Sequence, residues 1–326
     1  MEAGATVTQT ECVSLDGEGM PPQSWSRVDA EKFFVRNGPN YTKNKRKERN
    51  NGDSFYELRA MDWLNNSRRK VDGVAKLAAA AGLPEAEFSH PSVPSLLVVN
   101  VQLPMEAPKV FKGTTLDGPT LHAVFYFTLK EETAKALQDL ESAKPSVRLL
   151  AEYFRRAQSE PAMRSRFKAI AVVNNQDVIN MARLITPFNG KPVLITESGS
   201  LMRGTRRSGA AAGQAGGSEG AVGDEAGGVG GGGDGRCSSG SGSGCGGGGG
   251  GGNFGRDEFL ELDIHVRRWN FVARKGLHKL APKFGLMNVS VAFLIEGRED
   301  AELPEQVLGC ATVNCFDIAK ARDIDE

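Results

Sequence analysis

The segment Ser95-Leu96-Leu97-Val98-Val99-Asn100-Val101-Gln102-Leu103 is almost wholly apolar and rich in β-branched residues, and Pro104 follows it. Such a run predicts a central strand that is buried on both faces. Leu121–Leu129 (LHAVFYFTL) predicts a second strand. Glu258–Val266 (EFLELDIHV) predicts a third, in which apolar and polar side chains alternate between the two faces. The core of the protein is therefore expected to contain a β-sheet.

Further strands and helices are expected on both sides of these three segments. They do not alternate regularly along the chain, which favours an antiparallel or mixed sheet over a doubly wound one. The fold class predicted is α+β, with a mixed, mostly antiparallel sheet and packed helices. The other predicted strands are Lys32–Arg36, Phe55–Met61, Arg166–Val173, Lys191–Glu197, Asn288–Glu296 and Leu308–Phe316, and the predicted helices are Val71–Ala81, Lys130–Leu140, Ser146–Ala157, Asp177–Leu184 and Trp269–Leu280.

Glycine is concentrated in one tract of the chain. Of the 40 glycines, 25 lie between Gly204 and Gly255. The apolar content of this tract is too low to offset the entropy lost on ordering, so residues 204–255 are predicted to be a disordered insertion within a hairpin. Residues 25–203 and 256–320 are expected to form one domain around it. Residues 1–24 are polar and are expected to form an unpacked, disordered tail.

Composition and charge exclude several classes of protein. The 40 basic and 40 acidic side chains cancel, so no overall field attracts nucleic acid, and no nucleic-acid partner is expected. The cysteine count is odd and no C-x-x-C pair occurs, which argues against a disulfide framework or a zinc site. No signal peptide or transmembrane segment is evident. A cytoplasmic protein is expected, with a peripheral association with intracellular membranes as one option.

Motifs for catalysis are scarce. The glycine tract lacks the Lys-Ser or Lys-Thr of a phosphate loop, and no Gly-x-Ser-x-Gly elbow occurs. Glu261, Asp263 and His265 share one face of a predicted strand, where they could bind a divalent metal or act as an acid/base pair. The ordinary alternative is a solvent-facing side of the strand. The sequence does not say whether Glu302 and Glu305 approach Glu261. No cofactor is expected, and we expect the protein not to be an enzyme.

A basic run provides the strongest charge signal. It contains Lys43, Lys45, Arg46, Lys47 and Arg49, with only Glu48 opposing them. A polybasic loop can contact anionic lipid head groups, each basic side chain contributing about 1 kcal/mol near the surface. A solvated loop explains the run equally well, and both interpretations stay open.

Several landmarks occur in a fixed order from Trp25 to Ile318. After Trp25 they are Phe33-x-Val35-Arg36-x-Gly38-Pro39-Asn40-Tyr41-x-x-Asn44-Lys45-x-Lys47, Val99–Pro104, Arg166-Phe167-Lys168, Asn189–Pro192, Phe259–Ile264 and Ala301–Gly309. Together they resemble the C-terminal domain of plant Enhanced Disease Resistance proteins. In that family the domain often follows a pleckstrin-homology domain and a lipid-transfer domain of the START type, neither of which this sequence contains. The resemblance implies a setting in lipid-linked signalling at intracellular membranes.

The leading functional hypothesis is a non-catalytic, lipid- or membrane-associated regulatory module of this family, whose partner is an anionic lipid or membrane surface. Its tentative head-group contacts are the basic side chains between Lys43 and Arg49. The first alternative is a protein-interaction scaffold in which the glycine tract is a flexible spacer. The second is a metal-assisted hydrolase built on Glu261, Asp263 and His265.

Overall fold

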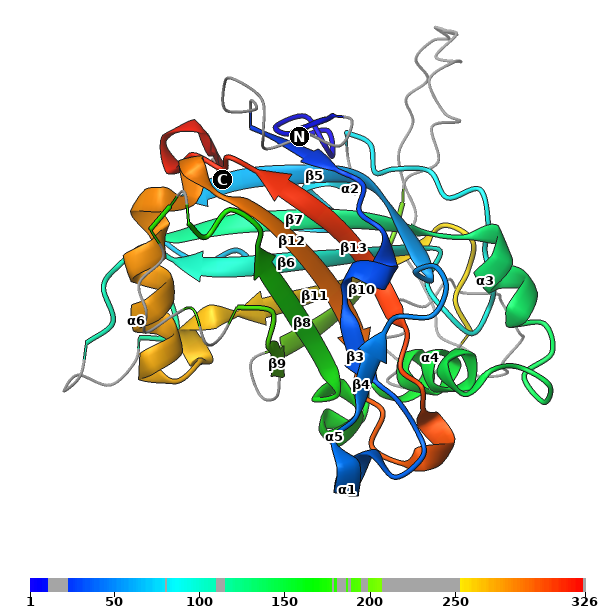
Figure 1. Ribbon diagram of the computed structural model, residues 1–326. Helices are drawn as coiled ribbons and strands as arrows, with labels where there is room; N and C mark the ends of the chain where they lie inside the picture. Colours follow the sequence, from blue (N-terminus) through cyan, green and yellow to red (C-terminus); the bar gives the residue numbers. More distant parts are fainter. Residues whose placement is uncertain are drawn as a thin grey trace, which may run out of the picture. The chain divides into compact units, whose positions relative to one another are not determined.

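Two six-stranded β-sheets packed face to face form the body of the computed structural model (Figure 1). The first sheet has the strand order β10-β11-β6-β7-β5-β14, and the second has the order β1-β2-β13-β12-β8-β9. A separate two-stranded hairpin joins β3 to β4. The structure describes residues 1–10, 23–79, 81–109, 115–177, 179–180, 186, 189–194, 199–206 and 253–324.

The strand pairing is mostly antiparallel, and the parallel pairs are β11–β6, β14–β5 and β1–β2. The predicted α+β fold with a mixed, mostly antiparallel sheet is thereby confirmed. The strands are β1 (Thr8–Gln9), β2 (Ser24–Ser26), β3 (Phe34–Arg36), β4 (Lys47–Arg49), β5 (Tyr56–Asn66), β6 (Leu96–Pro104), β7 (Thr120–Leu129), β8 (Phe167–Val173), β9 (Pro192–Leu194), β10 (Gly199–Thr205), β11 (Glu258–His265), β12 (Asn288–Ile295), β13 (Val307–Asn314) and β14 (Arg322–Asp323).

Aromatic side chains fill the space between the two sheets. The Phe293 ring on β12 packs edge-on against Phe125 and Phe127 on β7, with centroid distances of 5.4 and 5.9 Å. On β11 the alternation predicted from the sequence places Leu260 and Leu262 in this core. Burying a side chain of this size contributes about 1.5–3 kcal/mol, so this layer contributes strongly to the stability of the fold.

The helices lie mainly at the two ends of the sheets. In Figure 1, α3 and α4 lie at one end and α6 covers the other. Pro145 opens α4, a position where its missing N–H costs no hydrogen bond. One face of α4 buries Leu150, Tyr153 and Phe154 in the inter-sheet core. The helices are α1 (Tyr41–Asn44), α2 (Val74–Ala79), α3 (Glu131–Ala136), α4 (Pro145–Arg156), α5 (Pro161–Arg164) and α6 (Phe271–Leu280).

The outer faces of the two sheets are also covered. Over the first sheet, α2 buries Val74, Ala75 and Ala78 against β-strand side chains that include Tyr126 and Phe259. Over the second sheet, Phe33 and other residues beside β3 pack against β8, β12 and β13. Both sheets are therefore buried on two faces over much of their length, as the apolar run of β6 predicts.

The start of the chain corrects one expectation. Residues 1–10 and 23–24, expected to belong to an unpacked tail, are ordered against the first and second sheets. Val7 is 2% exposed, and residues 8–9 form β1. The buried carboxylate of Asp62 accepts hydrogen bonds from the backbone N–H groups of Gly4 and Thr6, at 2.8 and 3.1 Å. A buried carboxylate needs such donors, and the N-terminal segment supplies them.

A second difference concerns the strand that enters the glycine tract. The segment Lys191–Glu197 was expected to pair with Glu258–Val266, but β9 lies at the edge of the second sheet. The antiparallel partner of β11 is instead β10, a strand that the sequence did not predict. Residues 207–252, and with them most of the predicted disordered insertion, lie outside the described residues. Most of the helix expected over residues 177–184 also lies outside them, and the proposed domain boundaries stay a prediction.

None of the helices in the described ranges combines the length and the apolar character that crossing a bilayer requires.

Candidate functional site

A pocket of about 300 Å³ lies between the two sheets, beside the Phe125–Phe293 contact. The first sheet lines it with Trp63 and Phe125, and the second sheet lines it with Val291 and Phe293. All the lining side chains are apolar except that of Lys191. A volume near 300 Å³ with an apolar lining is typical of a site for a small hydrophobic molecule.

Segments around α6 complete the pocket. Trp269 precedes the helix, Leu277 and Leu280 lie on it, and Phe284 follows it; all four line the pocket. Small side chains on β8 explain why the space is open, because Ala169 and Ala171 line it where larger residues would fill it. A protein interior normally packs without such a gap. The pocket was not predicted from the sequence, because apolar strand residues that line a cavity follow the same pattern as those in a solid core.

The predicted site residue Glu261 lies on the other face of the first sheet, under α2. Its side chain is 0% exposed, and its two carboxylate oxygens accept hydrogen bonds from the backbone N–H groups of Val74 and Ala75, at 2.9 and 2.8 Å. Burial, followed by the neighbouring Asp263 carboxylate, raises the pKa of Glu261 well above its ordinary value. The geometry is that of a buried acid that holds the first turn of α2 on the sheet.

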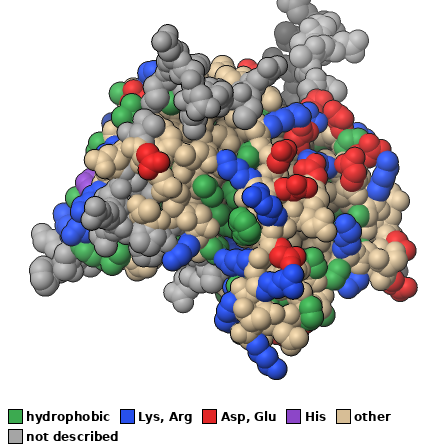
Figure 2. Space-filling model, viewed as in Figure 1, with side chains coloured by type: hydrophobic (Ala, Val, Ile, Leu, Met, Phe, Trp, Pro, Cys, Tyr) green, Lys and Arg blue, Asp and Glu red, His purple; other side chains and the backbone are tan. Residues whose placement is uncertain are grey.

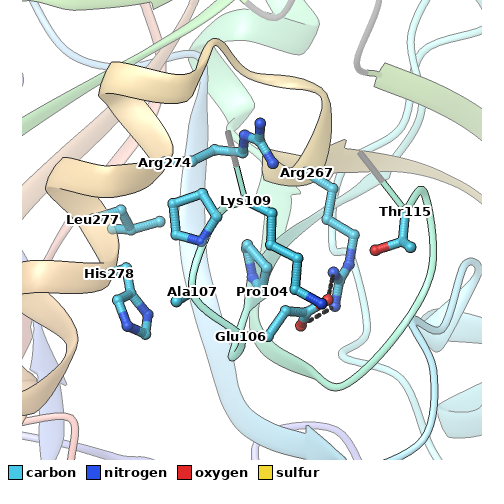
Figure 3. A pocket seen from close by; sticks show the side chains of 10 residues that line it. Pro104, Glu106, Ala107, Lys109, Thr115, Arg267, Arg274, Leu277 and His278 are labelled. Atoms are coloured by element: carbon cyan, nitrogen blue, oxygen red, sulfur yellow. Dashed lines mark hydrogen bonds and ion pairs between the residues drawn. The ribbon is translucent and has the colours of Figure 1, made fainter. Parts of the chain in front are cut away.

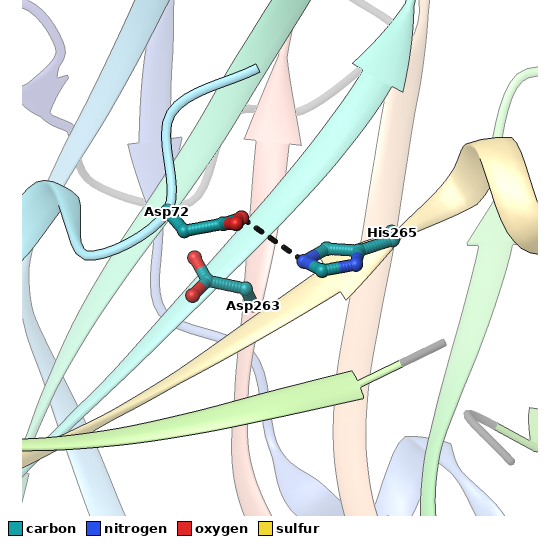
Figure 4. Close-up of side chains that lie close together, drawn as sticks. All are labelled: Asp72, Asp263 and His265. Carbon is teal, nitrogen blue, oxygen red and sulfur yellow. Dashed lines mark hydrogen bonds and ion pairs between the residues drawn. The ribbon is translucent and has the colours of Figure 1, made fainter. Parts of the chain in front are cut away.

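Asp263 and His265 are brought together with Asp72, which the sequence analysis did not single out (Figure 4). One ligand atom from each of the three lies within 4.8 Å of the others, and His265 Nε2 is 3.0 Å from Asp72 Oδ1. Lys70 forms an ion pair with the second oxygen of Asp72. Such a set of donors could bind a divalent cation, but here the ammonium of Lys70 already balances one of the carboxylates.

The expectation that this side of the strand faces solvent is wrong, since Glu261, Asp263 and His265 are all buried. The structure brings Asp263 and His265 together, whereas the carboxylate oxygens of Glu261 accept hydrogen bonds from the backbone of α2. Neither Glu302 nor Glu305 joins them, because Glu302 pairs with Arg166 and Glu305 with Lys168, beside the second sheet. The metal-site hypothesis therefore stays a prediction, and its candidate ligands become Asp72, Asp263 and His265.

Three further polar residues, Asn100, Gln102 and His122, lie on the same face of the first sheet. Asn100 donates from Nδ2 to Asp263 at 2.7 Å, and its Oδ1 lies 3.0 Å from Nδ1 of His122. His122 is 0% exposed, and burial lowers its pKa to about 4. The Nδ2 group of Asn100 and the Nε2 group of Gln102 also donate to the carbonyl of Val71, at 3.1 and 3.0 Å. These polar side chains tie the segment before α2 to the sheet.

The predicted head-group residues lie on an exposed hairpin. Lys43 lies on α1 and Lys45 directly follows this helix. Lys47 and Arg49 lie on β4. Arg46 forms an ion pair with Glu48, the acid within the run, so this carboxylate offsets the charge of one of the five basic side chains. At the foot of the view in Figure 2, over α1, the outermost side chains are those of Lys or Arg. The structure keeps these cations together and accessible.

The same hairpin carries an exposed aromatic side chain. Phe34 on β3 is 52% exposed, and the guanidinium of Arg49 lies over its ring at 5.4 Å. Tyr41 is flanked by Arg36 and Lys45, whose cationic groups lie 4.8 and 5.7 Å from its ring centroid. Such cation–π contacts hold the rings and the cations together on the surface of the hairpin.

The fold and the pocket define the class of the protein: an α+β domain of two facing sheets that enclose an apolar pocket. A family model described as "Protein ENHANCED DISEASE RESISTANCE 2, C-terminal" matches residues 25–204 and 245–317. The chain belongs to this family, as its landmarks indicated. Neither the curated proteins nor the solved structures searched yielded a significant match.

Proposed function

We propose that this domain is a non-catalytic lipid-binding module that holds one lipid chain in the apolar pocket between its sheets. The pocket is the observation that carries the proposal. Its lining is apolar apart from Lys191, and it leaves open space between two sheets that pack tightly elsewhere. Unfilled apolar space of this size costs stability, because the lining atoms lose dispersion contacts. A ligand that fills it recovers those contacts.

An acyl chain matches the chemistry of the lining. Each buried methylene contributes about 0.8 kcal/mol, so about eight methylenes are enough to offset the cost of immobilising a ligand, which is several kcal/mol. The rings of Trp63, Phe125 and Phe284 offer flat apolar surfaces to such a chain. Small polar metabolites would find few hydrogen-bond partners there.

The basic hairpin supports a role at a membrane. Five basic side chains between Lys43 and Arg49 outnumber the single acid Glu48, and Phe34 is exposed beside them. We propose that this hairpin approaches anionic head groups, so that the domain docks on a membrane from which its ligand is taken. Such attraction weakens as salt increases.

The pocket is tested with a neutral fluorescent acyl probe, the methyl ester of cis-parinaric acid. Wild-type protein should show a saturable rise in fluorescence at one probe per chain. Ala171→Phe places a ring in the pocket and should abolish saturable binding. Ala162→Phe adds the same ring at an exposed position of α5 and should bind like the wild type. Equal binding by folded Ala171→Phe and wild type would contradict the proposal.

A further inference from the structure

A second, smaller pocket lies beside α6 and has the opposite character (Figure 3). Its volume is about 110 Å³. Arg267, Arg274, Lys109 and His278 line it together with one acid, Glu106. Two guanidinium groups and an ammonium group line the pocket with a single carboxylate, so the lining has an excess of positive charge.

Arg267 is held firmly in this pocket. It is 5% exposed, and its Nη1 and Nη2 groups form an ion pair with the two oxygens of Glu106. The Nη2 group also donates to the carbonyl of Pro119 at 2.6 Å. Although burial acts in the other direction, the hydrogen bonds from Arg267 lower the pKa of Glu106, so the acid stays ionised. The carboxylate of Glu106 occupies the paired Nη groups of this guanidinium, so the positive charge left for a ligand comes mainly from Arg274 and Lys109.

Two donors of this pocket have no acceptor. Among the described residues, neither the Nε group of Arg267 nor that of Arg274 has a hydrogen-bond partner, and both atoms are buried. A buried charged donor without an acceptor costs about 1–3 kcal/mol or more. Because both atoms are buried, a ligand in the pocket does not reach them directly, and it is the net positive charge of the lining that favours an anion.

The basic pocket adjoins the apolar one through three segments. Leu277 on α6 lines both pockets. At the end of β6, Leu103 lines the apolar pocket and Pro104 the basic one. Ahead of α6, Trp269 lines the apolar pocket and Arg267 the basic one. A single amphiphile could therefore place its chain on one side of these residues and its head group on the other.

We infer that the ligand is an anionic amphiphile whose carboxylate or phosphate group binds to Arg274 and Lys109, beside the buried Arg267–Glu106 pair, while its chain fills the apolar pocket. This inference rests on the proposed function. It adds the chemical class of the head group and the residues that recognise it.

The experiment compares two probes with the same chain, cis-parinaric acid and its methyl ester. Wild-type protein should bind the acid about tenfold more tightly than the ester. Arg274→Gln combined with Lys109→Gln should remove this preference while the affinity for the ester is unchanged. Lys279→Gln, at an exposed position of the same helix, is the matched control and should keep the preference.

Each outcome separates the inference from the proposed function. Equal binding of acid and ester by the wild type would overturn the inference and leave the proposed function standing. If neither probe binds, both fail. A competition experiment adds millimolar inorganic phosphate to both probes. If phosphate weakens the binding of the acid but not that of the ester, phosphate and the carboxylate share one anion site. Phosphate bound without any effect on the acid would show a site for free anions, which also overturns the inference.

Discussion

Phe125 on β7 and Phe293 on β12 meet across the two sheets, with ring centroids 5.4 Å apart, and both rings line the apolar pocket. Phe293 also contacts Phe127 and Phe167, at 5.9 and 5.8 Å. This aromatic cluster joins the sheets on one side of the pocket, and α6 with its flanking residues encloses another side. Well-packed core thus bounds the pocket on these two sides.

The exposed hairpin should determine binding to membranes. Changing Lys45, Arg46 and Lys47 together to Glu reverses the local charge, so binding to anionic vesicles should be lost. Flotation with anionic and neutral vesicles measures this, and added salt should weaken the wild-type interaction. Lys275→Glu, a change at an exposed residue of α6, serves as a control for altered net charge. No flotation of the wild type would assign the basic run to a solvated loop and favour the protein scaffold.

The buried pair Lys168–Glu305 should be coupled in its effect on stability. The ammonium nitrogen lies 2.6 Å from both carboxylate oxygens, and the two side chains are 3% and 0% exposed. Lys168→Met leaves the buried Glu305 with only the more distant guanidinium of Arg36, at 3.7 Å, and should lower the free energy of unfolding by about 3 kcal/mol. Denaturant titrations of this variant, Glu305→Gln and the double variant measure the coupling.

The exposed pair Arg46–Glu48 offers a matched control for that cycle. Arg46→Met should change the unfolding free energy by less than about 1 kcal/mol, since exposed ion pairs contribute little. If the change in unfolding free energy of the double variant equals the sum of the changes in the two single variants, Lys168 and Glu305 are not coupled, which would contradict this prediction.

Acid should destabilise the fold through His122. Its pKa is about 4 in the folded state, below the ordinary value of 6.5, so the unfolded chain takes up a proton first as the pH falls. Stability is therefore retained above pH 6.5 and decreases by up to about 3 kcal/mol between pH 6.5 and pH 4. The raised pKa values of Glu261 and Asp263 act in the opposite direction, since these acids favour the fold when protonated.

Comparison of wild type with His122→Gln isolates the histidine, because both proteins retain the two acids. Denaturant unfolding at several pH values should show a steeper loss of stability towards pH 4 for the wild type. The same pH dependence in both proteins would refute the assignment.

The boundaries of the glycine tract matter for stability. β10 and β11 pair as far as Thr205 and Glu258, and Phe254 packs its ring against Phe154 at a centroid distance of 6.3 Å. Replacing residues 208–250 with a short Gly-Ser linker should change the unfolding free energy by only about 1 kcal/mol, because loop closure depends weakly on length. Deleting Gly204–Arg256 removes Phe254 and should cost about 3 kcal/mol or more. Equal stabilities of the two deletion variants, measured by denaturant unfolding, would contradict this.

The strands could largely be predicted from the sequence, because buried strands carry long apolar or alternating runs. The segment Leu121–Leu129 is an example, since β7 differs from it by one residue. In contrast, β10 reads GSLMRGT, where two glycines weaken the strand signal. Gly204 is required there because a Cβ atom would collide with the ring of Phe259 on the paired strand. Such a requirement is visible only once the pairing is known.

The sites were less accessible to sequence reasoning. Asp72 joins Asp263 and His265 only because the segment before α2 folds back over the first sheet. The two pockets depend on the separation of the sheets and on where α6 lies, which no local pattern encodes. The landmark Arg166-Phe167-Lys168 gains a physical reason from the structure, since its two cations pair with the acids of the landmark that contains Glu302 and Glu305.

Tryptophan fluorescence with a fatty acid brominated at mid-chain tests the central claim most directly. Of the three tryptophans, Trp63 and Trp269 line the apolar pocket, whereas Trp25 is buried outside its lining. We predict saturable quenching at one ligand per chain, and its loss in Ala171→Phe. Quenching that does not saturate, or that is equal in wild type and folded Ala171→Phe, would contradict a lipid site between the sheets.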